Sequence, residues 1–183
     1  MSGHSKWSKV KHQKATTDVV KGAAFTKASR AITLAVREGG GIPDPEKNFR
    51  LRLAIEKARA VNMPKENIAR AIDKAAGGGA GDIEQVIYEG YGPGGVAFMV
   101  EAATDNRNRT VSVVKNMFER NGGTLAGPGA VSFLFTKSVE QDQMVIRSTY
   151  TVPVTEEVRD QIDALIADLE ALDDIQQIFT NVE

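Results

Sequence analysis

Apolar residues in the first 78 positions recur three or four residues apart, which is the spacing of one face of an α-helix. One such face, between residues 21 and 37, comprises Phe25, Ala28, Ile32, Ala35 and Val36. A second, between residues 45 and 62, comprises Leu51, Ala54, Ile55, Ala58 and Val61. A third begins at Pro64, which as a first helical residue loses no intrahelical hydrogen bond, and comprises Ile68, Ile72 and Ala75. We therefore predict an all-helical, three-helix first domain over residues 1–78.

The rest of the chain has short runs of Val, Ile, Phe and Tyr that alternate with two amphipathic helical stretches, which is typical of an α+β domain. The runs predict strands at residues 85–91, 95–103, 130–136, 144–153 and 174–181. The helical stretches cover residues 106–121 and 155–172. From Gly95 onward the order is βαββαβ, so we predict a ferredoxin-like domain over residues 83–183 with one extra leading strand.

Between the two patterns, residues 77–81 are all glycine except Ala80. Neither a helix nor a strand tolerates such a run, because glycine loses more backbone entropy than any other residue when it is ordered. We therefore expect residues 79–82 to form a linker between two domains, and the protein to be an α+β multidomain chain.

The net charge of −1 conceals two oppositely charged halves. Up to Gly78 there are sixteen Lys and Arg residues against seven Asp and Glu, a net of +9; beyond it there are seven against seventeen, a net of −10. A strongly basic half indicates a polyanionic partner such as nucleic acid. The alternative is that the two halves simply attract one another, or that their charge serves solubility.

The residue inventory argues against most enzymatic chemistry. The chain has no cysteine, and its two histidines, His4 and His12, both lie in the basic N-terminal segment, where they are poorly placed to activate a serine or threonine nucleophile. The longest apolar runs are too short to span a bilayer, and the start of the chain lacks the apolar region of a signal peptide. We expect a cytoplasmic, non-enzymatic protein with no metal, no other cofactor, no small-molecule substrate and no membrane partner.

The glycine-rich stretch of residues 90–95 is better explained by structure than by phosphate binding. It lacks the Lys-Ser/Thr ending of a phosphate-binding loop, and a strand rather than a helix follows it. Pro93 and Gly94 suit the two central positions of a type II turn. We predict that this stretch is the turn of a hairpin.

Arg107 and Arg109 lie in the first turn of the helix predicted at residues 106–121, which is the end of a helix that disfavours cations. An anion must compensate them. Two interpretations stay open: a phosphate, which would make Arg107 and Arg109 a secondary anion or interaction site, or a carboxylate within the domain, such as Glu101.

Basic residues of the N-terminal segment and the first helix form the strongest candidate binding surface. Each phosphate that Lys or Arg neutralises releases counterions, which favours binding to nucleic acid. Trp7 can stack on a base, or it can anchor the helical core while the lysines remain a solvated face. The predicted nucleic-acid-binding residues are His4, Lys6, Trp7, Lys9, Lys11, His12, Lys14, Lys27, Arg30 and Arg37.

Several short motifs occur in order along residues 1–137: GHSKW at 3–7, KHQKA at 11–15, FTK at 25–27, NMPK at 62–65, YEGYGPGG at 88–95, TDNRNRT at 104–110 and GAV at 129–131. Together they resemble the YebC/PmpR family, which also includes mitochondrial translational activators of cytochrome c oxidase. Residues 149–183 are similar to that family's C-terminus. Chance agreement over so many segments is implausible.

The resemblance implies a helical first domain followed by α+β domains, with roles in transcriptional regulation through DNA binding and in translation at the ribosome, and no enzymatic activity. Family members usually carry a third domain between the strand that ends near Thr136 and the one that begins near Met144. Here only residues 137–143 connect the two strands. The βαββαβ unit can close without the inserted domain, so we expect the fold to survive its absence.

The leading hypothesis is a regulator of gene expression that binds DNA with little direct reading of sequence, because the basic helices have few Asn or Gln residues suited to base contacts. A ribosome-associated translation factor that binds ribosomal RNA with the same surface is the first alternative. A protein-interaction module that uses the acidic second domain is another. The target gene or message, the direction of regulation and the oligomeric state leave no mark in the sequence.

Overall fold

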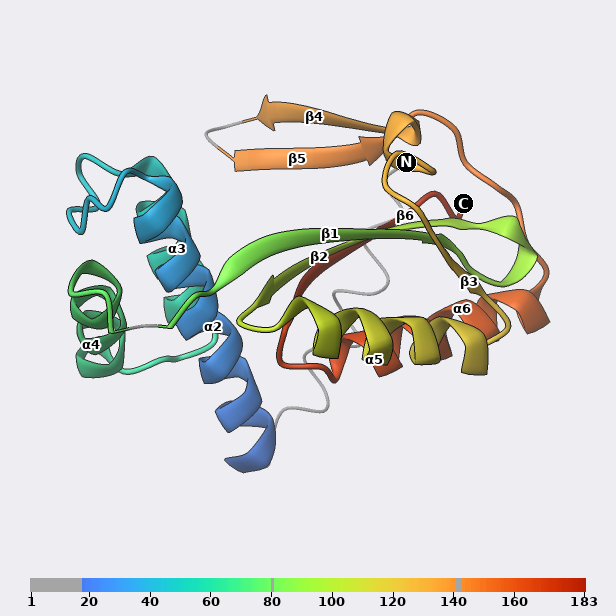
Figure 1. Cartoon of the computed structure of the whole chain (residues 1–183). Helices are drawn as coiled ribbons and strands as arrows, with labels where there is room; N and C mark the ends of the chain where they lie inside the picture. Colours follow the sequence, from blue (N-terminus) through green and yellow to red (C-terminus); the bar gives the residue numbers. More distant parts are fainter. Residues whose placement is uncertain (1–17, 80, 141–142) are drawn as a thin grey trace. The chain divides into compact units, whose positions relative to one another are not determined.

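A computed structural model describes residues 18–79, 81–140 and 143–183. The chain divides into two compact units, Met1–Ile83 and Glu84–Glu183, which we call the first and the second unit (Figure 1). The first contains helices and the second contains both helices and strands, so the predicted α+β class with a helical N-terminal part is confirmed.

The described part of the first unit consists of α2 (Asp18–Glu38), α3 (Phe49–Ala60) and α4 (Lys65–Ala76), in agreement with the three predicted helices. Their apolar faces meet in one core, whose buried members are Ile32, Ala35, Val36, Leu51, Ala54, Ile55, Ala58, Met63, Ile68 and Ala75. The helices therefore follow from the periodicity of the sequence.

The second helix begins four residues later than predicted, because Asn48 caps it. The buried Asn48 side chain accepts a hydrogen bond from the Leu51 amide at 3.1 Å and donates to the carbonyl oxygens of Ala35 and Ile42, both at 3.0 Å. Pro64 directly precedes α4 as its N-cap, rather than lying inside the helix. At Gly39 a β-carbon would lie 2.1 Å from the Asn48 amide nitrogen, so the close approach of this loop requires glycine.

The second unit is built on a four-stranded antiparallel sheet in the order β3-β1-β2-β6. Its strands are β1 (Glu84–Tyr91), β2 (Ala97–Thr104), β3 (Thr124–Ala126) and β6 (Ile175–Thr180). The helices α5 (Arg107–Arg120) and α6 (Glu156–Glu170) cover one face of it (Figure 1). The Phe98 and Phe118 rings meet edge to face in this core, with centroids 5.6 Å apart.

The remaining strands, β4 (Phe135–Glu140) and β5 (Gln143–Ser148), form a separate two-stranded sheet. This hairpin covers the other face of the main sheet (Figure 1), where Val131, Phe135 and Ile146 pack on Ala97 and Met99. Short 3-10 turns at Pro93–Gly95 and Ser132–Leu134 complete the unit.

The strand order differs from the predicted βαββαβ arrangement. The strands expected at residues 130–136 and 144–153 pair only with one another, and the supposedly additional leading strand β1 lies in the middle of the sheet. The reason is local: the tight turn after β1 makes β1 and β2 a hairpin, and the three-residue β3, too short to predict, pairs with the other edge of β1. Helices on one face of an antiparallel sheet are present, but the chain connects the strands differently.

The segment between β1 and β2 is the predicted hairpin turn, with Pro93 and Gly94 between the residues that its hydrogen bond joins. Gly94 has φ 70° and ψ 9°, which a residue with a β-carbon adopts at a cost, and the Gly95 amide donates to the Gly92 carbonyl at 3.2 Å. The structural interpretation of residues 90–95 is therefore confirmed. No helix in the described part of the chain has the length and apolar character to cross a membrane.

Candidate nucleic-acid interface

The predicted binding residues fall into two groups. His4, Lys6, Trp7, Lys9, Lys11, His12 and Lys14 lie outside the described residues. Lys27, Arg30 and Arg37 all lie on α2. The structure therefore describes the surroundings of the second group only.

Arg37 fastens the glycine-rich segment to the end of α2. Its guanidinium donates to the Ile83 carbonyl at 3.0 Å and to the Gly81 carbonyl, and lies 3.8 Å from the Asp82 carboxylate. Two of its donors are thus used within the first unit, which leaves fewer N–H groups of Arg37 available to a ligand.

Arg30 lines an open groove of about 370 Å³ between α2 and α4, which we call the α2–α4 groove. Its α2 wall consists of residues one helical turn apart on one face: Phe25, Thr26, Ser29, Arg30 and Thr33. Its α4 wall follows the same periodicity and consists of Asn67, Arg70, Ala71 and Lys74, with Met63 and Ile83 completing the lining. The two helices pack directly on one another, which fixes the walls.

The groove has a chemical division suited to an anionic ligand with an apolar part. Four of the lining residues are apolar, namely Phe25, Met63, Ala71 and Ile83. Hydroxyl and amide side chains come from Thr26, Ser29, Thr33 and Asn67, and cationic ones from Arg30, Arg70 and Lys74. The lining contains no carboxylate, so the formal charge of its side chains is entirely positive.

Arg70 and Lys74 were missed by the sequence reasoning, which assigned phosphate contacts only to residues up to Arg37. The signal was present, since Asn67, Arg70 and Lys74 are spaced as one polar stripe on the third helix. The stripe lines a groove only because α2 packs beside it, and the sequence of α4 alone does not show this packing. Neither Arg70 nor Lys74 forms an ion pair with any residue that the structure describes.

Three other cations of the first unit have partners in the structure. Arg50 pairs with Glu38, Lys47 lies 3.7 Å from Asp44, and the Arg52 guanidinium stacks 5.3 Å from the centre of the Phe49 ring. In the groove, by contrast, Arg70 and Lys74 lie among hydroxyl, amide and apolar lining residues.

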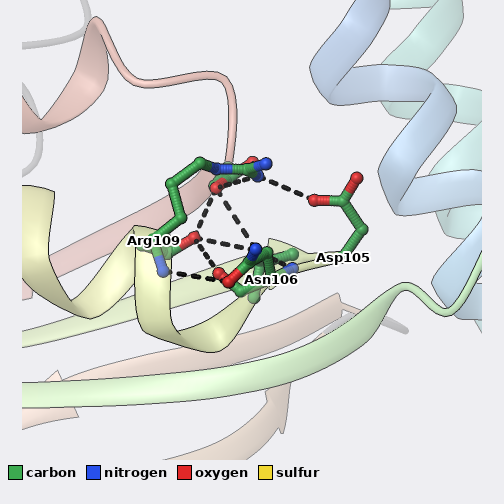
Figure 2. A network of polar contacts seen from close by, with 6 residues as sticks. Asp105, Asn106 and Arg109 are labelled. Atoms are coloured by element: carbon green, nitrogen blue, oxygen red, sulfur yellow. Dashed lines mark hydrogen bonds and ion pairs between the residues drawn. The ribbon is translucent and has the colours of Figure 1, made fainter.

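Arg107 and Arg109, the predicted secondary anion site, are compensated by carboxylates of the second unit. Arg107 Nε lies 2.6 Å from Glu84 Oε1. Arg109 Nη2 lies 2.7 Å from Asp105 Oδ1 and 3.0 Å from Asp174 Oδ2, in a network that Figure 2 shows from close by. Of the two open interpretations, the ion pairs support compensation by carboxylates within the domain, although Glu101, the example given, is not one of the partners. Glu101 lies instead 3.8 Å from Lys137 of β4, on the other face of the sheet.

Asp174 is the centre of this network. It is 8% exposed, and its Oδ2 accepts hydrogen bonds from the hydroxyl groups of Thr110 at 2.5 Å and Thr104 at 3.3 Å, in addition to Arg109. Asn106 caps α5 by accepting from the Arg109 amide at 3.0 Å (Figure 2). The network thus ties the start of α5 to the segment before β6, and its donors and acceptors satisfy one another.

Glu89 is a second buried carboxylate, 6% exposed, with a structural role. It accepts the amides of Gly129, Val131 and Ser132 at 2.7–2.8 Å and so holds the loop before β4. Burial raises its pKa, but these backbone donors outweigh burial and the net pKa is lowered. A carboxylate that three amides hold ionised takes up a proton less readily, which makes it a weak general base. Among described residues no group of three His, Asp or Glu side chains is placed to hold a metal ion.

Two family models match the chain. The TACO1/YebC protein N-terminal domain matches residues 5–78, and the TACO1/YebC second and third domain matches residues 83–140. The second match ends at Glu140, the last residue of β4.

Curated relatives extend the similarity to the rest of the chain. A protein of Finegoldia magna is 49% identical over 184 residues, covering 100% of this chain and 74% of the relative, and one of Roseiflexus castenholzii is 47% identical over 185 residues, covering 99% and 71%. A Nitratiruptor protein is 57% identical over 148 residues, covering 78% of this chain and 62% of its own length. Each is named a probable transcriptional regulatory protein.

The fold is shared with a solved structure. The crystal structure of a conserved hypothetical protein from Aquifex aeolicus is similar with a TM-score of 0.85 and 36% sequence identity, over 97% of this chain and 96% of that one. The family resemblance seen in the short motifs is thereby confirmed over the whole length of the sequence, and the chain belongs to the TACO1/YebC family.

Proposed function

We propose that this protein is a non-enzymatic regulator of gene expression that binds nucleic acid through its first unit, and that the bound nucleic acid is DNA. The observation that carries the proposal is the basic first unit, which combines a net charge of +9 up to Gly78 with a groove lined by Arg30, Arg70 and Lys74 and by no carboxylate. The names of the relatives, probable transcriptional regulatory proteins, support the regulatory part.

The proposed contacts are to phosphate. Lys27 and Arg30 of α2, with the N-terminal cations Lys6, Lys9, Lys11 and Lys14, provide the charge, and Trp7, His4 and His12 lie in the same segment of the sequence. Because counterion release dominates such binding, affinity falls as salt rises, with a slope of about 0.9 for each phosphate neutralised on duplex DNA. Arg37 contributes indirectly, because its hydrogen bonds to the Gly81 and Ile83 carbonyls hold residues 81–83 against α2.

The direct test is a salt titration with the full chain. Fluorescence anisotropy of a labelled 20-base-pair DNA should give a log–log slope of several units, and changing Lys9, Lys11 and Lys14 to Ala should reduce both the slope and the affinity. Affinity that is unaltered by these changes would favour the protein-interaction alternative, in which the acidic second unit is the working surface.

Ribosomal RNA is the competing target, since it is also a phosphate polyanion. Co-sedimentation with ribosomes and binding to promoter fragments, measured at the same physiological salt, separate the two. Retention on ribosomes together with weak, uniform DNA binding would replace the transcriptional role by a translational one.

A further inference from the structure

We infer that the α2–α4 groove holds one unstacked nucleotide of a single-stranded nucleic acid, with the base against the apolar lining and the adjoining phosphates at Arg70 and Lys74. This inference rests on the proposed function and deepens it, because it specifies the form of nucleic acid that the first unit selects.

The apolar lining is the first part of the argument. Phe25 and Ile83 are half-buried, and Met63 is 6% exposed, so the groove offers an aromatic side chain and aliphatic surface at its base. A planar base is the only apolar part of a nucleic acid large enough to use such a surface. Bases of a duplex are stacked and present only their edges, whereas an unstacked base can present its face.

The cations give the second part. Arg70 and Lys74 are separated by one turn of α4, both are exposed, and neither is paired with a carboxylate in the described part of the chain. They lie on the same wall as Asn67 and opposite the α2 hydroxyl groups. Phosphates on either side of an inserted base would therefore meet fixed positive charge without loss of an existing ion pair.

The polar side chains and the size of the groove give the third part. Ser29 and Asn67 can donate to or accept from a base edge or a ribose hydroxyl, which is compatible with any of the bases. The volume of about 370 Å³ lies near the lower end of the range of about 300–1,000 Å³ typical of small-ligand sites, so it suits one nucleotide and not a longer stacked segment.

The test compares three probes with the full chain at 0.15 M salt: a fluorescein-labelled 12-nucleotide single-stranded DNA of mixed sequence, the corresponding labelled 12-base-pair DNA duplex, and AMP as competitor. The variant Ser29→Trp fills the groove without changing charge, and Ser112→Trp makes the same change on the exposed face of α5 in the second unit. Unchanged circular dichroism and denaturation midpoint establish that both variants fold.

The expected result is at least about tenfold tighter binding of the single strand than of the duplex, which is the effect of one stacked base. Ser29→Trp should remove this preference and leave duplex affinity unaltered, and Ser112→Trp should change neither. Equal affinities for the two forms, or a preference that survives Ser29→Trp, would overturn the inference. AMP binding as tight as that of the 12-mer would also overturn it, because the groove would then be a free-nucleotide site.

A second measurement covers the case in which Ser29→Trp does not fold. Single-stranded DNA that contains 4-thiothymidine is photocrosslinked to the unmodified protein, and the crosslinked peptides are identified by mass spectrometry. Crosslinks at Phe25 or Met63 support the inference, and crosslinks confined to other segments contradict it. Salt-dependent binding of both forms with equal affinity leaves the proposed function standing while this inference fails; no binding of either form removes both.

Discussion

The arginines at the start of α5 and the two cations of α4 that line the groove have opposite surroundings. In the second unit, Arg107 and Arg109 have carboxylates within 2.6–3.0 Å, and one of these, Asp174, is buried. In the first unit, Arg70 and Lys74 border a groove whose lining contains no acid. The contrast teaches that the position of an arginine in the sequence, even at the unfavourable end of a helix, does not identify a binding site until its partners are known.

The comparison predicts that stability and nucleic-acid affinity depend on different residues. Substitutions in the carboxylate networks of the second unit should lower the stability of that unit and leave nucleic-acid affinity alone. Substitutions of the cations in the α2–α4 groove should lower nucleic-acid affinity and leave the stability of the first unit unchanged.

The largest effect is expected at Glu89. Changing Glu89→Ala leaves the amides of Gly129, Val131 and Ser132 without their carboxylate acceptor, and the amide of the buried Val131 then carries a desolvation cost. We expect a loss of about 3 kcal/mol in the free energy of unfolding of the second unit, measured by urea denaturation. Nucleic-acid affinity measured on the folded fraction should be unchanged, and a parallel loss of affinity would break the separation.

Asp174→Ala should come next. It removes the acceptor of the Arg109 guanidinium and of two threonine hydroxyl groups, although Thr104 and Thr110 can still bond to one another at 2.8 Å. We expect a loss of about 2 kcal/mol, seen as a lower denaturant midpoint. The conservative variant Asp174→Asn should lose less, since it keeps one acceptor oxygen. Equal losses in the two variants would contradict a role for the carboxylate's second oxygen.

The double variant Arg70→Ala/Lys74→Ala sharpens the other side of the comparison. Both side chains are exposed and unpaired among the described residues, so their removal should leave the denaturation midpoint unchanged. Affinity for nucleic acid should fall about tenfold at physiological salt, and the salt slope should decrease by about one to two units. The matched control, Lys47→Ala/Arg50→Ala, removes the same charge from cations that already have acidic partners and should have the smaller effect on affinity.

A smaller effect is expected from pH. The folded-state pKa of Glu89 is lowered from its usual 4.5, so the unfolded chain takes up this proton first as pH falls. The stabilisation from Glu89 is therefore complete above about pH 4.5 and is lost as pH falls through the lowered pKa. Unfolding measured between pH 6 and pH 3 should show a flatter acid limb for Glu89→Gln than for the unmodified protein. Identical limbs would show that other carboxylates dominate acid unfolding.

The smallest effect is expected from Arg107→Ala. The side chains of Arg107 and Glu84 are 60% and 46% exposed, and an exposed pair of this kind contributes little because solvent screens it. Removal of a cation from the first turn of α5 also relieves an unfavourable interaction with the helix dipole. We expect no measurable change in the denaturation midpoint or in affinity, and a clear loss of affinity would restore Arg107 as an anion site.

Much of the fold was predictable because it is local. Apolar residues at helical spacing predicted the three helices that the structure describes in the first unit, and Pro93-Gly94 predicted the turn that makes β1 and β2 a hairpin. The order of strands was not predictable, since it depends on which edges meet after the chain has turned. β3 has only three residues, and its pairing with β1 leaves no pattern in either segment.

The candidate site was predictable only in part. Its charge and the contribution of Arg30 follow from the sequence, but the wall that contains Arg70 and Lys74 requires α4 to pack on α2. The burial of Glu89 was also not predictable from the sequence. A glutamate in a strand is expected to face solvent, but here the loop of residues 129–132 covers its side chain.

The β4–β5 hairpin has a consequence for how members of this family can vary. Glu140 pairs with Gln143 at its tip, and the match to the model of the second and third domains ends at Glu140. The entropic cost of closing a loop rises only slowly with the length of the loop. A long insertion between two paired strands therefore destabilises the pairing only slightly. The tip of this hairpin is therefore a position where a folded domain can be inserted or deleted while the strand pairing between β4 and β5 is kept.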